Sequence, residues 1–147
     1  MDAYFFDVRL KEPIIMSTFN SLEEAQKFFE NDRFATINGM KIESLTEDGS
    51  VCSMDITNDH RNAYGGIMGG VIFTLGDFAF AAASNNAHTP TVALDVNINF
   101  LSSSKGTHLT ATAKCVKSGR TTSVYNVMIT DEFGKDVAMF IGTGYKL

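Results

Sequence analysis

The chain has 147 residues, of which 44% are hydrophobic and 20% are charged, and this is the size and composition of one globular domain with a substantial core. Its formal net charge is −5, so it lacks the basic surface that binding to nucleic acid requires. The most apolar stretch, residues 71–83, is shorter than the ~20 residues that a membrane-spanning helix needs, and residues 1–10 do not resemble a signal peptide. We therefore expect a cytoplasmic protein that has neither nucleic acid nor a membrane as a partner.

The first twenty residues form an N-terminal extension whose structure the sequence pattern does not define. Apolar and polar residues alternate over 4–9, which permits a strand, and an extension wrapped on the surface is the alternative. Ser21 then stands three residues before Glu24, which is the spacing of a capping box. Apolar residues at helical spacing follow, so we predict a short amphipathic helix that runs to about Asn31.

Two strands joined by a hairpin follow this helix. Apolar and polar residues alternate over 41–46 and over 50–56, and the Glu-Asp-Gly sequence at 47–49 between them is a turn signal. The polar residues after the hairpin, together with Gly65 and Gly66, predict a loop that leads into the next element.

The next element is a long helix from Gly69 to about Asn86 that is apolar on nearly every face. A helix of this kind is normally buried. Its one ionisable residue is Asp77, and a carboxylate is rarely buried unless it is paired or has a function. Two interpretations are open: Asp77 caps a neighbouring backbone segment, or it is a catalytic acid in a cleft.

Four strands of about ten residues complete the chain, over 92–100, 107–117, 121–130 and 136–145. In the first of them the alternation predicts a half-buried antiparallel strand with one apolar face. That face consists of Val92, Leu94, Val96, Ile98 and Phe100. The order of elements predicts an α+β fold in which one long antiparallel sheet wraps around the central apolar helix. No linker or repeat divides residues 21–147, so we expect them to form a single domain.

A fixed spacing of polar residues and glycines marks the entrance to the helix. Asn62 is followed by six residues, then by Gly69 and Gly70, and Asp77 stands seven positions after the second glycine. This pattern resembles the signature of the hotdog-fold acyl-CoA thioesterases, and the most similar branch is the phenylacetate-pathway (PaaI-like) type. Further stretches similar to that family lie at 29–42, 96–101 and 118–125. The match covers residues 28–147 and implies the hotdog fold.

The resemblance also implies a reaction, the hydrolysis of an acyl-CoA thioester to a free acid and CoA, with no metal and no other cofactor. It implies that Asp77 is the general base or the nucleophile and that the Gly69 N–H polarises the thioester carbonyl. It also implies that Asn62 holds the thioester or the attacking water. A helix N-terminus offers free N–H donors and partial positive charge, which suit an oxyanion. Glycines such as Gly69 and Gly70 let a carbonyl approach the backbone closely.

The spacing of Gly69 and Asp77 limits how one site can contain both. Eight positions span about 12 Å of helix at 1.5 Å per residue, so both residues cannot reach one carbonyl from the same straight helix. Two antiparallel helices side by side can bring Gly69 of one chain near Asp77 of another. We therefore expect a composite site in a homodimer. The resemblance implies the same, and such dimers commonly pair into homotetramers in the family.

Met68 departs from the family pattern, which usually has His at this position to orient the loop and the substrate. Methionine can fill the space but cannot form comparable hydrogen bonds, so activity is reduced, shifted in substrate or absent. We predict that Met68 and Gly70 contact the substrate. CoA carries several phosphate charges, so an acidic chain needs local cations. Cations flank the motif loop or the strand turns at Arg61, Lys105, Lys117 and Arg120. We predict that Arg61 and Arg120 bind the substrate; a solvated surface charge is the alternative for each of the four.

Two other functions on the same fold are alternatives to thioester hydrolysis. A hotdog dimer that binds acyl-CoA or a small aromatic ligand without turnover is favoured by Met68 and opposed by Asp77. A hydratase or dehydratase on the same fold generally needs a His beside the helix acid, and Met68 argues against it.

The sequence lacks the motifs of two other enzyme classes. The glycine-rich loop lacks the Lys-Ser/Thr ending of a P-loop, which argues against nucleotide hydrolysis, and no Gly-x-Ser-x-Gly motif of a serine hydrolase occurs. The three histidines, His60, His88 and His108, lack metal-ligand spacing and are interpreted as surface residues.

Overall fold

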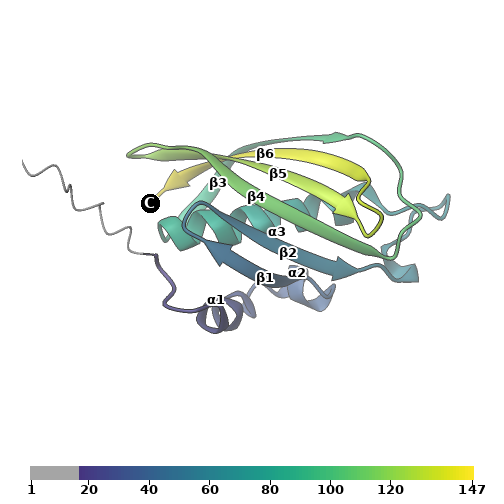
Figure 1. Ribbon diagram of the computed structural model, residues 1–147, viewed down its shortest axis with the longest axis horizontal. Helices are drawn as coiled ribbons and strands as arrows, with labels where there is room; N and C mark the ends of the chain where they lie inside the picture. Colours follow the sequence, from purple (N-terminus) through teal and green to yellow (C-terminus); the bar gives the residue numbers. More distant parts are fainter. Residues whose placement is uncertain (1–16) are drawn as a thin grey trace, which may run out of the picture.

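The computed structural model describes residues 17–147 and contains a six-stranded antiparallel sheet that curves around one long helix (Figure 1). The strand order is β1-β2-β4-β5-β6-β3. In chain order the elements are α1 (Leu22–Phe29), α2 (Arg33–Ile37), β1 (Lys41–Thr46), β2 (Gly49–Asp55), the 3-10 turn η1 (Asn58–His60), α3 (Gly69–Ala87), β3 (Thr91–Phe100), β4 (His108–Ser118), β5 (Thr122–Asp131) and β6 (Asp136–Lys146). The predicted α+β architecture is confirmed.

The predicted helices and strands are present, with boundaries within two residues of those expected from the pattern. The helix at Ser21 is one example: the Ser21 hydroxyl accepts a hydrogen bond from the Glu24 N–H at 3.1 Å. The return bond differs from a standard capping box, because the Glu24 carboxylate accepts from the backbone N–H of Asn20 at 3.0 Å. The short helix α2 and the turn η1 were not predicted. Both lie near the start of α3, where they form part of the surroundings of the candidate site.

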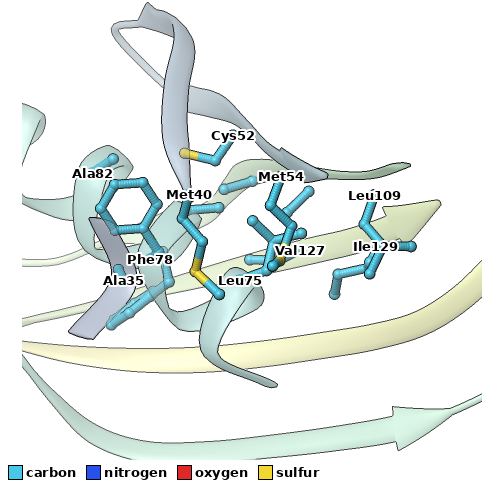
Figure 2. Packing of buried hydrophobic residues seen from close by; sticks show 14 of the residues in the cluster. Ala35, Met40, Cys52, Met54, Leu75, Phe78, Ala82, Leu109, Val127 and Ile129 are labelled. Carbon is cyan, nitrogen blue, oxygen red and sulfur yellow. The ribbon is translucent and has the colours of Figure 1, made fainter. Parts of the chain in front are cut away.

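The core lies between α3 and the inward face of the sheet (Figure 2). Leu75, Phe78 and Ala82 of α3 are almost completely buried. They pack in one cluster with inward side chains of the sheet and of the segment before it, among them Met40, Cys52, Met54, Leu109, Val127 and Ile129. Burying side chains of this size stabilises the fold by about 1.5–3 kcal/mol each. This packing fixes the position of α3 against the sheet. The residues at the start of α3 and on the face that is turned away from the core are therefore also held in place.

Strand β3 corrects one sequence prediction. It pairs antiparallel with β6, but it is the edge of the sheet, and the register shifts between Ala93 and Asp95. This β-bulge leaves Leu94 without a partner and reverses the alternation on one side of it. The five apolar residues of the strand therefore do not share one continuous face, and Leu94 is 64% exposed. The prediction of a single half-buried apolar face was wrong, because a bulge depends on pairing with a distant strand.

The N-terminal extension is described only from Ser17 onward, so the strand predicted within residues 4–9 lies outside the described residues. The backbone N–H of Thr18 donates to the carbonyl of Asn86 at 2.7 Å, near the end of α3, and Phe19 is buried. No helix in the part of the chain described by the structure is long and apolar enough to span a membrane.

Candidate active site

The loop before α3 is a closed turn organised by Asn62. The Asn62 side-chain oxygen accepts hydrogen bonds from the backbone N–H groups of Tyr64 at 3.0 Å and of Gly66 at 3.1 Å. The Asn62 N–H also donates to the Gly66 carbonyl at 2.8 Å. Gly65 has a φ of +80°, a conformation that favours glycine. The side-chain oxygen of Asn62 is thus used by the loop, while its NH₂ group makes no hydrogen bond to a described residue and can donate to a substrate or a water.

Gly69 is the first residue of α3, and no described residue accepts a hydrogen bond from its N–H. The residue before it, Met68, provides no side-chain cap to the helix. The carbonyl of Met68 accepts the N–H groups of Val71 at 3.0 Å and of Ile72 at 3.4 Å, whereas the N–H groups of Gly69 and Gly70 have no acceptor among the described residues. Free N–H donors at a helix start can stabilise an oxyanion. This geometry supports the role predicted for Gly69.

Asn62 and Gly69 line the same cavity, of about 320 Å³, at the entrance to α3. Phe100 of the edge strand forms another wall of it. A Cβ atom added at Gly69 would lie 3.2 Å from the Phe100 ring, so a larger residue would have to displace that ring. Three consecutive serines, Ser102, Ser103 and Ser104, complete the lining. The structure therefore brings together two of the three predicted catalytic residues.

Asp77 lies two turns further along α3 and is half-buried. Burial raises the pKa of Asp77 above its usual value, and the nearby carboxylate of Asp32, at the start of α2, raises it further. Among the described residues, no backbone or side-chain donor forms a hydrogen bond to Asp77. The capping interpretation therefore finds no support within residues 17–147. A carboxylate with a raised pKa is a better proton acceptor than an ordinary one, which suits a general base.

Within one chain, Asp77 does not face the cavity of Gly69. Successive residues of a helix are rotated by about 100°, so Asp77 shares its face with Gly70, Phe73 and Thr74. Gly69 and Ile72, which line the cavity of Asn62, lie on a neighbouring face. The eight positions between Gly69 and Asp77 add about 12 Å along the axis. One protomer thus carries two separated halves of the predicted site.

A second cavity, of about 450 Å³, lies between α2, η1 and the first two turns of α3. Two predicted substrate-binding residues, Met68 and Gly70, line it. His60 lines it as well and is only 5% exposed, so its interpretation as a surface residue was wrong. His60 Nδ1 accepts a hydrogen bond from the Thr57 N–H at 3.0 Å, so the ring proton is on Nε2. This Nε2–H donates to the Asn38 side-chain oxygen at 3.2 Å.

His60 also holds the start of α3, because its carbonyl accepts the Met68 N–H at 2.9 Å. Sequence reasoning missed this residue. Its partner Asn38 lies 22 positions earlier, and no local pattern connects the two. The only local signal was Thr57 three positions before His60, because a Thr followed at that spacing by a side-chain acceptor is the arrangement of a capping box, which η1 has.

The two remaining histidines differ from each other. His108 forms an exposed hydrogen bond from Nδ1 to the Asp55 carboxylate at 2.8 Å. His88 follows α3, and its buried Nδ1 has no hydrogen-bond partner among the described residues, so a simple surface position does not describe it. No group of three His, Cys, Asp or Glu side chains within residues 17–147 is arranged to hold a metal ion.

The two predicted arginines lie at opposite ends of α3. Arg61 donates to the Gly65 carbonyl at 3.1 Å and so stabilises the loop of Asn62. Arg120 lies in the exposed turn between β4 and β5. The next residue in this turn, Thr121, accepts from the N–H of Lys146, and Lys146 pairs with Thr91 just after α3. Arg120 is therefore far from Asn62 within one chain.

Comparison with known proteins gives a consistent result. Residues 64–138 match the model of the thioesterase superfamily. The chain is 35% identical over 126 residues to acyl-coenzyme A thioesterase PaaI of Escherichia coli strain K12, an alignment that covers 85% of this chain and 90% of that protein. The solved structure of the E. coli PaaI protein from the phenylacetic acid degradation operon has a TM-score of 0.80 and 34% identity, covering 85% of this chain and 91% of that one. A hypothetical thioesterase from Streptococcus pneumoniae, solved with coenzyme A, has a TM-score of 0.75 and 30% identity over 82% of this chain and 94% of that one.

Proposed function

Because this chain belongs to the thioesterase superfamily and is a thioester hydrolase, we propose that its substrate is an acyl-CoA and that Asp77 carries the chemistry. The products are a free acid and CoA. The relatives named as acyl-CoA thioesterases and the similar structure that contains coenzyme A support this substrate. The phosphates of CoA would be met by cations at the rim, and Arg61 and Arg120 remain the candidates. A cytoplasmic location is part of the same proposal.

In the proposed reaction, Asp77 accepts a proton from a water molecule as the water oxygen attacks the thioester carbonyl carbon. The carbonyl oxygen becomes an oxyanion that the Gly69 N–H stabilises at the positive end of α3. The Asn62 NH₂ group orients the water or the thioester. Collapse of the intermediate then breaks the C–S bond, and the CoA thiolate takes up a proton. In a second form of the mechanism, Asp77 attacks the carbonyl itself and water cleaves the resulting anhydride.

The proposed site is shared by two protomers. The edge strand β3 has ten residues and no partner on its outer side among the described residues, and a long unpaired edge readily pairs with another copy. Phe100, at the end of this strand and beside Gly69, is 54% exposed. A second copy joined through β3, with its α3 antiparallel to this one, would cover these groups and bring its Asp77 toward Gly69. Two such dimers can pair into a tetramer.

One observation supports the proposal most strongly. Asp77 is half-buried, it is the only ionisable residue of α3, and it forms no hydrogen bond to a described residue. The test is a thiol-release assay with Asp77→Asn and Asp77→Ala. We expect kcat to fall by about 10²-fold or more, the usual contribution of a general base, while the fold is retained. Asp136→Asn, which changes an exposed carboxylate on β6, serves as the control and should keep the parental rate. If Asp77→Ala hydrolyses a good acyl-CoA at the parental rate, Asp77 is not the catalytic group.

A ligand-binding dimer without turnover is the second candidate, and Met68 is the observation that favours it. Its side chain is about half exposed at the start of α3, where it cannot orient a substrate through strong hydrogen bonds. Thermal-shift measurements with hydrolysable and non-hydrolysable CoA analogues detect binding, and thiol release detects turnover. Stabilisation by both analogues without thiol release would favour the binding protein.

A further inference from the structure

The 450 Å³ cavity beside α2 has the properties of a binding pocket for an apolar group. Its volume falls in the range of about 300–1,000 Å³ that is common for small-molecule sites. Aromatic and aliphatic side chains form most of its wall: Phe34, Met40, Met68, Val71 and Phe73. Phe34 is 69% exposed, although a phenylalanine of a soluble domain is usually covered. An apolar ligand in the cavity would cover part of this ring.

Three side-chain donors around the cavity form hydrogen bonds within the protein. The Asn38 NH₂ group donates to the Phe34 carbonyl at 2.8 Å, and the His60 Nε2–H donates to Asn38. The Thr74 hydroxyl donates to the Gly70 carbonyl at 2.7 Å. The side chains of the wall therefore present mainly carbon atoms and acceptor oxygens, while the Gly70 N–H remains a donor without an acceptor among the described residues. The apolar side chains fit an uncharged hydrocarbon group, and the Asp59 carboxylate repels an anionic one.

Part of the α3 side of the cavity shares a helix face with Asp77. Gly70, Val71, Phe73 and Thr74 form this side, and Gly70, Phe73 and Thr74 precede Asp77 by seven, four and three positions on the same helix face. The nearest of them are therefore about 4.5–6 Å from Asp77 along the helix axis. A thioester whose carbonyl lies at Asp77 can extend its acyl chain into this cavity, while its CoA portion leaves in the opposite direction.

We propose that this cavity receives the acyl group and that it selects uncharged, mainly hydrocarbon acyl chains. The assignment rests on the proposed thioesterase function and goes beyond it by naming the class of acyl group and the protomer that holds it. The same protomer provides the cavity and Asp77, and its partner provides Gly69 and Asn62. His60 is a positioning residue of the cavity, because its hydrogen bond to Asn38 ties α2 to the start of α3.

Helix α2 offers a matched pair of variants for the test. Phe34 and Ile37 are 69% and 68% exposed, respectively, but only Phe34 lines the cavity. Because both side chains are exposed, neither alanine substitution should unfold the protein. We expect Phe34→Ala to lower kcat/KM for octanoyl-CoA by about tenfold or more, the effect of losing an apolar contact with the bound chain, and to lower kcat/KM for acetyl-CoA much less. Ile37→Ala should change neither substrate.

The outcomes separate this inference from the proposed function. A loss in Phe34→Ala that is equal for acetyl-CoA and octanoyl-CoA, no loss at all, or an equal loss in Ile37→Ala would overturn the assignment of the cavity. None of these results bears on Asp77, whose role is tested by Asp77→Asn on acetyl-CoA, the substrate that does not need the cavity.

The proposed preference for uncharged chains has its own measurement. Succinyl-CoA and butyryl-CoA have four-carbon acyl groups and differ by a terminal carboxylate. The parent protein should prefer butyryl-CoA, and Asp59→Asn should narrow the ratio of the two kcat/KM values by about threefold or more, because one like charge is removed. Equal use of both substrates by the parent, or an unchanged ratio in Asp59→Asn, would contradict the preference.

Discussion

The composite site predicts that two inactive variants restore each other's activity within one dimer. Asp77→Asn removes the proton acceptor from one protomer. Asn62→Asp removes the side-chain NH₂ donor from the other, and it retains an oxygen that can accept the Tyr64 and Gly66 N–H groups that hold the loop. Each variant alone damages both sites of its homodimer. A mixed dimer places both substitutions in one site and leaves the other site intact.

The expected activity of the mixed dimer follows from the geometry of α3. Gly69 and Asp77 are separated by about 12 Å along the axis, whereas a catalytic group must lie about 3 Å from the atom on which it acts. In the proposed mechanism, the carboxylate and the oxyanion donor of a site therefore come from different chains. A purified mixed dimer should have about half the parental kcat per dimer, because one of its two symmetric sites is intact. Its KM should equal that of the parent.

The assay needs two purification tags. Co-expression of the two variants, each with its own tag, and two successive affinity steps isolate the mixed dimer, and thiol release from an acyl-CoA measures its activity. Each variant purified alone gives the background. Mixed dimers that are no more active than this background would refute the shared site, because a site contained in one chain would be damaged in both protomers.

Three further outcomes follow from the same contacts. Because burial raises the pKa of Asp77 above 3.8, the folded state binds the Asp77 proton more tightly than the unfolded chain, and the stabilisation from this protonation is lost as the pH rises through the raised pKa. In urea unfolding, Asp77→Asn should therefore be more stable than the parent at neutral pH. The difference in the free energy of unfolding should become smaller toward acid pH. His60→Ala leaves Thr57 and Asn38 without their partner, and its free energy of unfolding should fall by about 2–4 kcal/mol; a loss below measurement error would contradict the positioning role. Met68→His should raise or broaden acyl-CoA hydrolysis in a thiol-release screen, and an unchanged profile would identify Met68 as a neutral replacement.

Local sequence periodicity was sufficient to predict most of the fold. The helix from Gly69 is apolar over many residues, and the strands after it alternate over about ten residues each, so each pattern is long enough to identify its element. The apolar pattern of the helix also made Asp77 a candidate site residue, because a carboxylate in an apolar helix conflicts with its surroundings whatever the rest of the fold is.

Features that depend on distant pairing could not be predicted. The bulge at Leu94 is set by the register between β3 and β6, which the sequence of β3 alone does not contain. Helix α2 has only five residues, and its N-cap residue Asp32 makes no side-chain hydrogen bond to the helix, so the helix is too short to be identified from its pattern. Without α2, the cavity beside α3 and the burial of His60 could not be expected.

In the proposed mechanism, the separation of Asp77 from Gly69 makes activity depend on the assembly as well as on the fold. A single α3 has one N-terminus, and the donors at that end cannot serve a carboxylate two turns away on another face. Moving the acid to the first turn would place it among the free N–H groups, where the positive end of the helix would lower its pKa and weaken it as a base. At its present position, burial and the carboxylate of Asp32 raise the pKa of Asp77. The proposed site therefore combines a strong base from one copy of this helix with a strong oxyanion donor from a second copy.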